Sequence, residues 1–316
     1  MELLTPPPEL VSYGLRAMKT VALASGGFDA QERALIDAAQ RWLGADLDVD
    51  ALEPITPEEL AGVLLDPKLR RQLVFGLLLL SLADGEASRE EADAVESFAR
   101  ALEVDAHEVT TFRRLSEGRL LLARVDVLRR FWVRPLIMQH AREGGVRWVV
   151  KAMAAFAGLR EDTELADRFR ALADYPEGTL GRAYADFILT NGFSFPGEKG
   201  SAPEPIVFHD LSHVLSGYGT DPAGEICVTA FSAGYRKEEP FTFLLFSMMQ
   251  FNLGIGLTPA APATKHEFDA PRTLTALRRG ARMNIDPSDG TWDYWPDMAS
   301  SLHMVRAKYG VTPLAE

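Results

Sequence analysis

An internal repeat in the first third of the chain constrains the fold more than any other feature. ALASGGFDAQERALIDAAQRWLG (22–44) aligns with SLADGEASREEADAVESFARALE (81–103) at an offset of 59 residues. In each copy an apolar run ends at Ala-(Ser/Asp)-Gly, a short turn follows, and an amphipathic pattern begins. Glycine stops a helix, and Asp29 or Ser88 is a good N-cap for the next one. The repeat therefore predicts a bundle of helices.

The rest of the sequence also has helical patterns, and strand-like alternation is nearly absent. Apolar or amphipathic runs cover 119–158, 241–257 and 274–285. We therefore predict an all-α protein in three parts. These parts are an acidic helical bundle with the repeat (1–117), a basic helical bridge (118–170) and a helical metal-binding domain (171–316).

The charge is unevenly distributed along the chain. The 316 residues include 45 acidic and 33 basic ones, and the net charge of −12 argues against a nucleic-acid partner. Acids dominate in 1–117, whereas bases dominate in 119–151, where arginines alternate with aromatic and aliphatic residues. Such a basic segment either lies on an anionic membrane surface or packs as a helix pair between the two flanking domains.

A few features bear on location. The single cysteine, Cys227, excludes an internal disulfide, favours a reducing compartment and is expected in the core. No run approaches the ~18 apolar residues that a spanning helix needs. MELLTPPPEL lacks the pattern of a secretory signal. We expect a cytoplasmic protein, with peripheral contact at the inner face of the membrane if the basic bridge binds there.

The stretch FHDLSHVLSGYGTDPAGE (208–225) is the densest cluster of metal-ligand residue types. On a helix, His209 and His213 lie one turn apart on one face, so both imidazoles can reach one ion. Asp210 lies ~100° round the helix, where it can ligate the ion or orient an imidazole.

A second helix is expected to bring a further acid to this cluster. Gly217 and Gly219 end the first helix, and Asp221 with Pro222 begins the next. Glu225 then lies in its first turn, facing the histidines. Three or four protein ligands with an open position are typical of a catalytic site. The mixed nitrogen and oxygen donors suit zinc, iron, manganese or cobalt.

Two parts of the chain resemble known families. Residues 15–110, with their doubled turn, resemble the tellurite-resistance TerB-like domain, in which the turn acids can bind a metal. The first copy has Ser25 and Gly27 where the second has Asp84 and Glu86. One half of such a site is therefore degraded, and the turn acids act either as helix caps or as ligands.

The second resemblance covers about 170–315. His209, Asp210, His213 and, after eleven residues, Glu225 form the pattern H-D-x-x-H-x11-E, which resembles the signature of the coenzyme Q biosynthesis family often called Coq-four. The flanks are also similar to that family: PEGTLGRAYADF (176–187), ALRRGARMNI (276–285), WDYWPDM (292–298) and MVRAKYGV (304–311). The TerB-like part is an addition to what is usual in this family. It therefore stays open whether the protein serves the synthesis of ubiquinone or of another prenylquinone.

The resemblance implies a divalent metal, usually zinc, held by these four residues. It also implies action on a prenylated aromatic lipid, with loss of the ring carboxylate at C1 and hydroxylation there, and association with other quinone-biosynthesis proteins. Two functions stay open: a metal-dependent oxidative decarboxylase of a prenylated hydroxybenzoate, and a non-enzymatic lipid-binding scaffold. A third option, a His-Asp phosphohydrolase, lacks suitable surroundings for its further histidine and aspartate. An oligomer is left open.

Two segments have competing interpretations within this hypothesis. Helix 241–257, with Met248 and Met249, either lines a prenyl site or packs in the core. The arginines of the helix over 274–285 either meet an anionic head group or form a solvated face; they are Arg278, Arg279 and Arg282.

Overall fold

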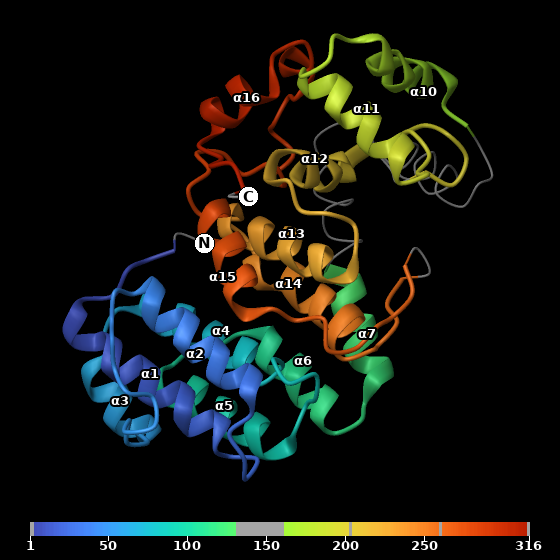
Figure 1. The fold of residues 1–316 in the computed structure, drawn as a ribbon. Coiled ribbons are helices and arrows are strands. Elements are labelled where there is room, and N and C mark those ends of the chain that lie inside the picture. The colour runs from blue at the N-terminus through green and yellow to red at the C-terminus, as the bar shows by residue number, and fades with distance from the viewer. Residues whose placement is uncertain (1–2, 131–160, 202–203, 259–260, 315–316) are drawn as a thin grey trace. The chain divides into compact units, whose positions relative to one another are not determined.

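The computed structural model describes residues 3–130, 161–201, 204–258 and 261–314 (Figure 1). Fourteen α-helices and no β-strand lie within these ranges, which confirms the all-α prediction. Isolated bridges join Thr179 to Ser301 and Leu253 to Lys265. Most of the predicted basic bridge, residues 131–160, lies outside the described residues. None of the described helices is both long and apolar enough to cross a membrane.

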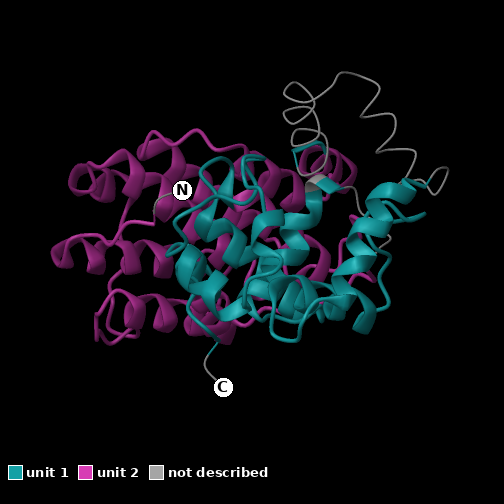
Figure 2. Cartoon of the chain, turned by 90° about the horizontal axis from the view of Figure 1, so that it is seen from above, with its two compact units in different colours: residues 1, 129–240, 276–316 teal, residues 2–128, 241–275 magenta. Residues whose placement is uncertain are grey.

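The chain forms two compact units, shown in different colours in Figure 2. Unit 1 contains residues 1, 129–240 and 276–316, and unit 2 contains residues 2–128 and 241–275. Neither unit is continuous in sequence, whereas the three predicted domains are. The segment 241–275 follows the candidate site in sequence but belongs to the unit built from the repeat.

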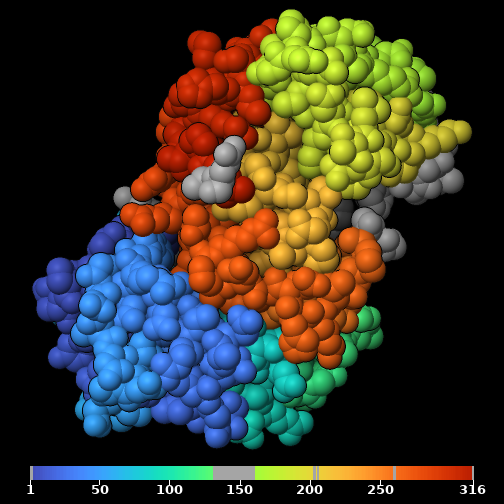
Figure 3. Space-filling view, in the orientation of Figure 1, coloured from blue at the N-terminus to red at the C-terminus, as the bar shows by residue number. Residues whose placement is uncertain are grey.

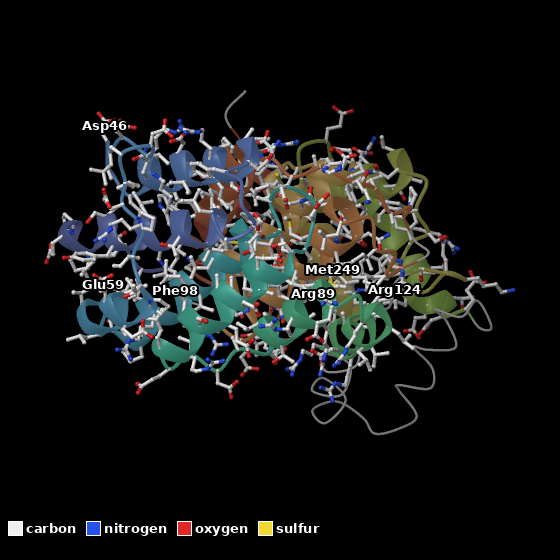
Figure 4. The ribbon with its side chains drawn as sticks, turned by 90° about the horizontal axis from the view of Figure 1, so that it is seen from below. Asp46, Glu59, Arg89, Phe98, Arg124 and Met249 are labelled. Carbon is white, nitrogen blue, oxygen red and sulfur yellow. The ribbon has the colours of Figure 1, made fainter. Side chains whose placement is uncertain are left out.

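Unit 2 contains the repeat. Asp29 caps its second helix by accepting from the Gln31 amide, and Ser88 caps the equivalent helix by accepting from the Glu91 amide. The capping role predicted for both residues is confirmed. Phe98 is 1% exposed and lies among the helices, whereas Asp46 is at the edge (Figure 4). The helices are α1 (Pro8–Ala22), α2 (Ala30–Trp42), α3 (Pro57–Val63), α4 (Pro67–Leu80), α5 (Arg89–Ala101), α6 (His107–Ser116) and α7 (Leu120–Leu128).

The segment 241–275 is held in unit 2 by aromatic packing and by a buried asparagine. Phe241 stacks on Phe75 with ring centroids 5.2 Å apart. Asn252 donates to the Leu82 carbonyl at 2.6 Å and accepts from the Phe268 amide at 3.0 Å. The turn of the second repeat copy is thus used to anchor a distant segment.

The helix predicted over 241–257 is shorter than expected. α14 (Pro240–Ser247) passes into a π-helical turn (Met248–Asn252) and ends there. Gln250 donates to the Ala261 carbonyl at 2.7 Å, so the chain folds back onto this turn. Met248 and Met249 are fully buried, which is what the core-packing interpretation of this segment expects.

Unit 1 holds the candidate site. Here α11 and α16 lie side by side (Figures 1 and 3), and the backbone joins them through the Leu302 amide, which donates to the Gly178 carbonyl at 2.8 Å. α15 begins in unit 2 and ends in unit 1. The helices are α10 (Thr163–Arg170), α11 (Leu180–Thr190), α12 (Val207–Ser216), α13 (Pro222–Tyr235), α15 (Ala270–Gly280) and α16 (Leu302–Tyr309).

Two equivalent glutamates of the repeat are buried in unit 2. Glu32 and Glu91 are each 2% exposed. Burial raises the pKa of Glu32 to about 8, against the hydrogen bond from the Asp29 amide, and the charges of Glu91 and Asp84 add to the rise. Burial likewise raises the pKa of Glu91 to about 7. Unit 2 therefore encloses carboxyl groups that resist ionisation.

Replacing Glu32 by Gln is expected to flatten the pH dependence of stability. The folded state holds the Glu32 proton more tightly than the unfolded chain does. The contribution of Glu32 to the free energy of unfolding is therefore complete below about pH 4.5 and is lost as the pH rises towards 8. Between pH 5 and 8 the wild type should lose on the order of 2 kcal/mol more than Glu32→Gln in urea denaturation of the full chain.

Glu59→Gln is the matched control. Glu59 occupies the same capping-box position in α3 but is exposed, and its hydrogen bonds to Thr56 lower its pKa. It stays ionised across this range, so its replacement should leave the slope unchanged. Parallel loss of stability in the wild type and Glu32→Gln would contradict the prediction.

Candidate metal centre

A tight corner between α12 and α13 builds the site. α12 ends at Ser216, and Gly217 follows with a left-handed φ of 81°. Asp221 caps α13 by accepting from the Gly224 amide at 3.0 Å, and Pro222 is the first helical residue. A Cβ on Gly224 would lie 2.2 Å from the Gly219 carbonyl oxygen, so only glycine lets the turn lie directly on α13. The predicted corner is confirmed.

The corner brings three of the four predicted residues together. His209, His213 and Glu225 offer ligand atoms that all lie within 4.8 Å of one another. Nε2 of His213 is 3.4 Å from Oε1 of Glu225, and Nε2 of His209 is 3.5 Å from Oε2. The His213 side chain is 2% exposed, whereas those of His209 and Glu225 are 19% and 20% exposed. His213 is therefore enclosed, whereas His209 and Glu225 are each partly exposed.

These distances fit a bound divalent metal. Two donor atoms that each lie ~2.1 Å from one tetrahedral zinc ion are ~3.4 Å apart. Both imidazole–carboxylate distances are close to this value. Three donors leave a fourth position free for a substrate atom or water. His209, His213 and Glu225 would hold the metal.

The tautomer of His213 supports the same conclusion. Its Nδ1 lies 3.0 Å from the Tyr218 carbonyl oxygen, which can only accept, so Nδ1 carries the hydrogen. Nε2 is then left with its lone pair facing the Glu225 carboxylate. Two acceptors in contact require a proton or a cation between them. Phe187 stacks on the imidazole with ring centroids 5.3 Å apart and fixes its plane.

The charges of Glu225 and the two histidines favour a cation at the site. Burial raises the pKa of Glu225, but interactions with His209 and His213 outweigh it and lower the pKa to about 2. Burial lowers the pKa of His213, but the Glu225 carboxylate outweighs it, so the pKa ends above its ordinary value. Glu225 is therefore ionised at neutral pH and holds positive charge beside it.

Asp210 has a different neighbour. It is not part of the group of three, and its carboxyl faces the Tyr184 hydroxyl of α11. Burial raises the pKa of Asp210, and the charges of His209 and His213 oppose the rise. Burial and the charge of Asp210 both raise the pKa of Tyr184. The Tyr184 hydroxyl is buried and has no hydrogen bond of ordinary geometry within the described residues.

Several residues at the site were not found from the sequence. Tyr218 and Phe187, which orient His213, carry no ligand chemistry of their own, so no residue type marked them. The turn acids of the repeat do not join any group of potential ligands within the described ranges. Cys227 is 1% exposed, as expected for a core residue.

The comparisons with known proteins add no family assignment. No family model matches the chain, and no curated protein or solved structure matches it significantly. The site is therefore defined by its geometry alone.

Zinc should stabilise the metal-depleted full chain, and more strongly at pH 8 than at pH 6, because protons compete for the imidazoles. Without metal, Glu225 contributes to the stability of the folded chain at neutral pH, and this contribution is lost as the pH falls from about 4.5 towards 2. The contribution of His213 to stability is instead lost as the pH rises above 6.5. Zinc at 100 times its Kd would add about 2.7 kcal/mol. Scanning calorimetry at both pH values measures the effect.

His303 supplies the control. It is exposed on α16, outside the ligand group. His209→Ala should abolish the zinc response, and His303→Ala should keep it. An equal response in both variants would place the zinc elsewhere.

Proposed function

We propose that this is a metal-dependent protein of ubiquinone or related prenylquinone biosynthesis that removes the C1 carboxylate from a polyprenyl hydroxybenzoate. The proposal joins the sequence resemblance over 170–315 to one observation. That observation is the convergence of the ligand atoms of His209, His213 and Glu225 to within 4.8 Å of one another, with His209 and Glu225 partly exposed. Zinc is the metal the resemblance favours; iron, manganese and cobalt suit the same donors.

The reaction and the role of the cation can be stated briefly. The bond between C1 and the carboxyl carbon breaks, carbon dioxide leaves, and the electron pair stays on the ring until a proton joins C1. A bound divalent cation supplies Lewis acidity, which stabilises negative charge on an oxygen of the substrate. Hydroxylation at the same carbon would also need dioxygen and a two-electron reductant supplied by another protein, such as a reduced flavin or nicotinamide; one oxygen atom would enter the ring and the other would leave as water.

The residues of the chain have separate tasks in this proposal. His209 and Glu225 are the partly exposed members of the group, so the aromatic head group would approach beside them. His213 is the enclosed member, held in one tautomer by the Tyr218 carbonyl. Asp210 faces the buried Tyr184 hydroxyl of α11, and its charge acts on both histidines, so it would tune the electrostatics of the site without holding the metal.

Glu225→Ala tests the proposal. The probe is a prenylated 4-hydroxybenzoate labelled in its carboxyl carbon, incubated with the purified, zinc-loaded full chain in detergent. We expect the wild type to release labelled carbon dioxide and Glu225→Ala to release at least about 100-fold less, because loss of a ligand should cost more than loss of an outer group that orients one, which already costs about 10- to 100-fold. Glu177→Ala, an exposed acid in the same unit, should keep full activity.

The same experiment separates enzyme from scaffold. If the chain is a lipid-binding scaffold, the wild type will release no label, yet the prenylated probe will bind. Glu225→Ala will then lose binding and fold together, because the metal would serve only to hold the corner. Release of label by the wild type and by Glu225→Ala alike would contradict both functions for this site.

A further inference from the structure

The last carbonyl groups of α12 find their hydrogen-bond partners mainly outside the helix. The last four carbonyls of an α-helix have no partner within the helix. In α12 the His213 carbonyl accepts from the Gly217 amide at 2.7 Å. The next three carbonyls, of Val214, Leu215 and Ser216, each accept from an arginine side chain.

These arginines come from two other elements of unit 1. Arg306 of α16 donates from Nε to Leu215 at 2.9 Å and from Nη2 to Val214 at 3.0 Å. Arg279 of α15 donates from Nη2 to Ser216 at 2.8 Å. Arg279 also donates twice to the Thr312 carbonyl, which ties the C-terminal segment to the same point. The end of α12 is therefore clamped from two sides.

The positive charges of Arg279 and Arg306 are compensated by backbone carbonyl groups and not by carboxylates. The hydrogen bonds found for the two guanidinium groups in the described part of the chain all go to carbonyls. Arg279 is only 5% exposed, although a solvated face was one expectation for it. Burial lowers the pKa of Arg306, and the nearby charge of Arg279 lowers it further. The partial negative charge of the helix end is what favours both cations here.

The clamp reaches the metal site through one turn. Arg279 lies over the Tyr218 ring, 5.1 Å from its centroid, while it binds the Ser216 carbonyl. Ser216 and Tyr218 flank Gly217 on its two sides. The Tyr218 carbonyl is the acceptor that orients the His213 imidazole. Arg279 thus contacts both sides of the turn that sets the direction of His213 Nε2.

We infer that Arg279 and Arg306 are positioning residues for His213, which they hold ready for metal through the end of α12 and the Gly217 turn. This inference rests on the metal site of the proposed function. Outer groups that orient a metal-binding histidine change metal affinity by about 10- to 100-fold when removed. The same range is expected here, although neither arginine touches a ligand.

Arg306→Met is the main test, because Arg306 is half-buried and its loss disturbs the core less than loss of Arg279. Zinc affinity of the full chain is measured by competition with a chromophoric chelator, and the visible spectrum of the cobalt-loaded protein is recorded. We expect zinc to bind 10- to 100-fold more weakly and the cobalt bands to shift. Arg306→Lys can reach only one carbonyl at a time. Its zinc affinity and cobalt spectrum should therefore lie between those of the wild type and of Arg306→Met.

Arg278→Met is the control, since Arg278 is exposed next to Arg279 and should leave affinity and spectrum unchanged. A wild type that binds no zinc would refute the metal site itself. A wild type that binds zinc tightly, with a folded Arg306→Met that matches it in affinity and spectrum, would overturn this inference alone. If Arg306→Met does not fold, Arg306→Lys decides by the same two measurements, together with the imidazole tautomer of His213 from nitrogen NMR shifts.

Discussion

The candidate site of unit 1 depends on a carboxylate that faces two imidazole nitrogens. Glu225 lies 3.4 and 3.5 Å from Nε2 of His213 and His209. In the metal-free chain this contact is favourable only when a proton lies between the groups, and a divalent cation could take the place of that proton. Because the His213 hydrogen is already committed to the Tyr218 carbonyl at Nδ1, the direction of Nε2 is fixed before any ligand arrives.

Residues both near to and far from Glu225 in the sequence hold this contact in place. Asp221 and Gly224 shape the corner locally, through a cap and through the absence of a side chain. The end of α12 is held instead by Arg279 and Arg306, which lie far along the chain. The corner between α12 and α13 is thus supported both by its own turn residues and by side chains from distant elements of unit 1.

Unit 2 uses its polar groups differently. Its repeat places equivalent glutamates, Glu32 and Glu91, in the interior, where burial favours their protonated forms. In the turn of the second copy, the Leu82 and Ala83 carbonyls accept hydrogen bonds from the Asn252 side chain, which anchors the segment that follows α13. The chain therefore leaves unit 1, completes unit 2 and returns within α15. No pattern of composition marks that return, so contiguous domains were the natural expectation.

The sequence by itself determined the features that depend on neighbouring residues. Asp29, Ser88 and Asp221 cap helices as predicted, and His209, His213 and Glu225 lie together as their spacing predicted. Only the tertiary structure decided the rest. The π-turn that ends at Asn252, the burial of Arg279 and the pairing of Asp210 with Tyr184 depend on partners distant in sequence. A cap or a helical face follows from local backbone geometry, whereas these interactions form only when separate helices pack.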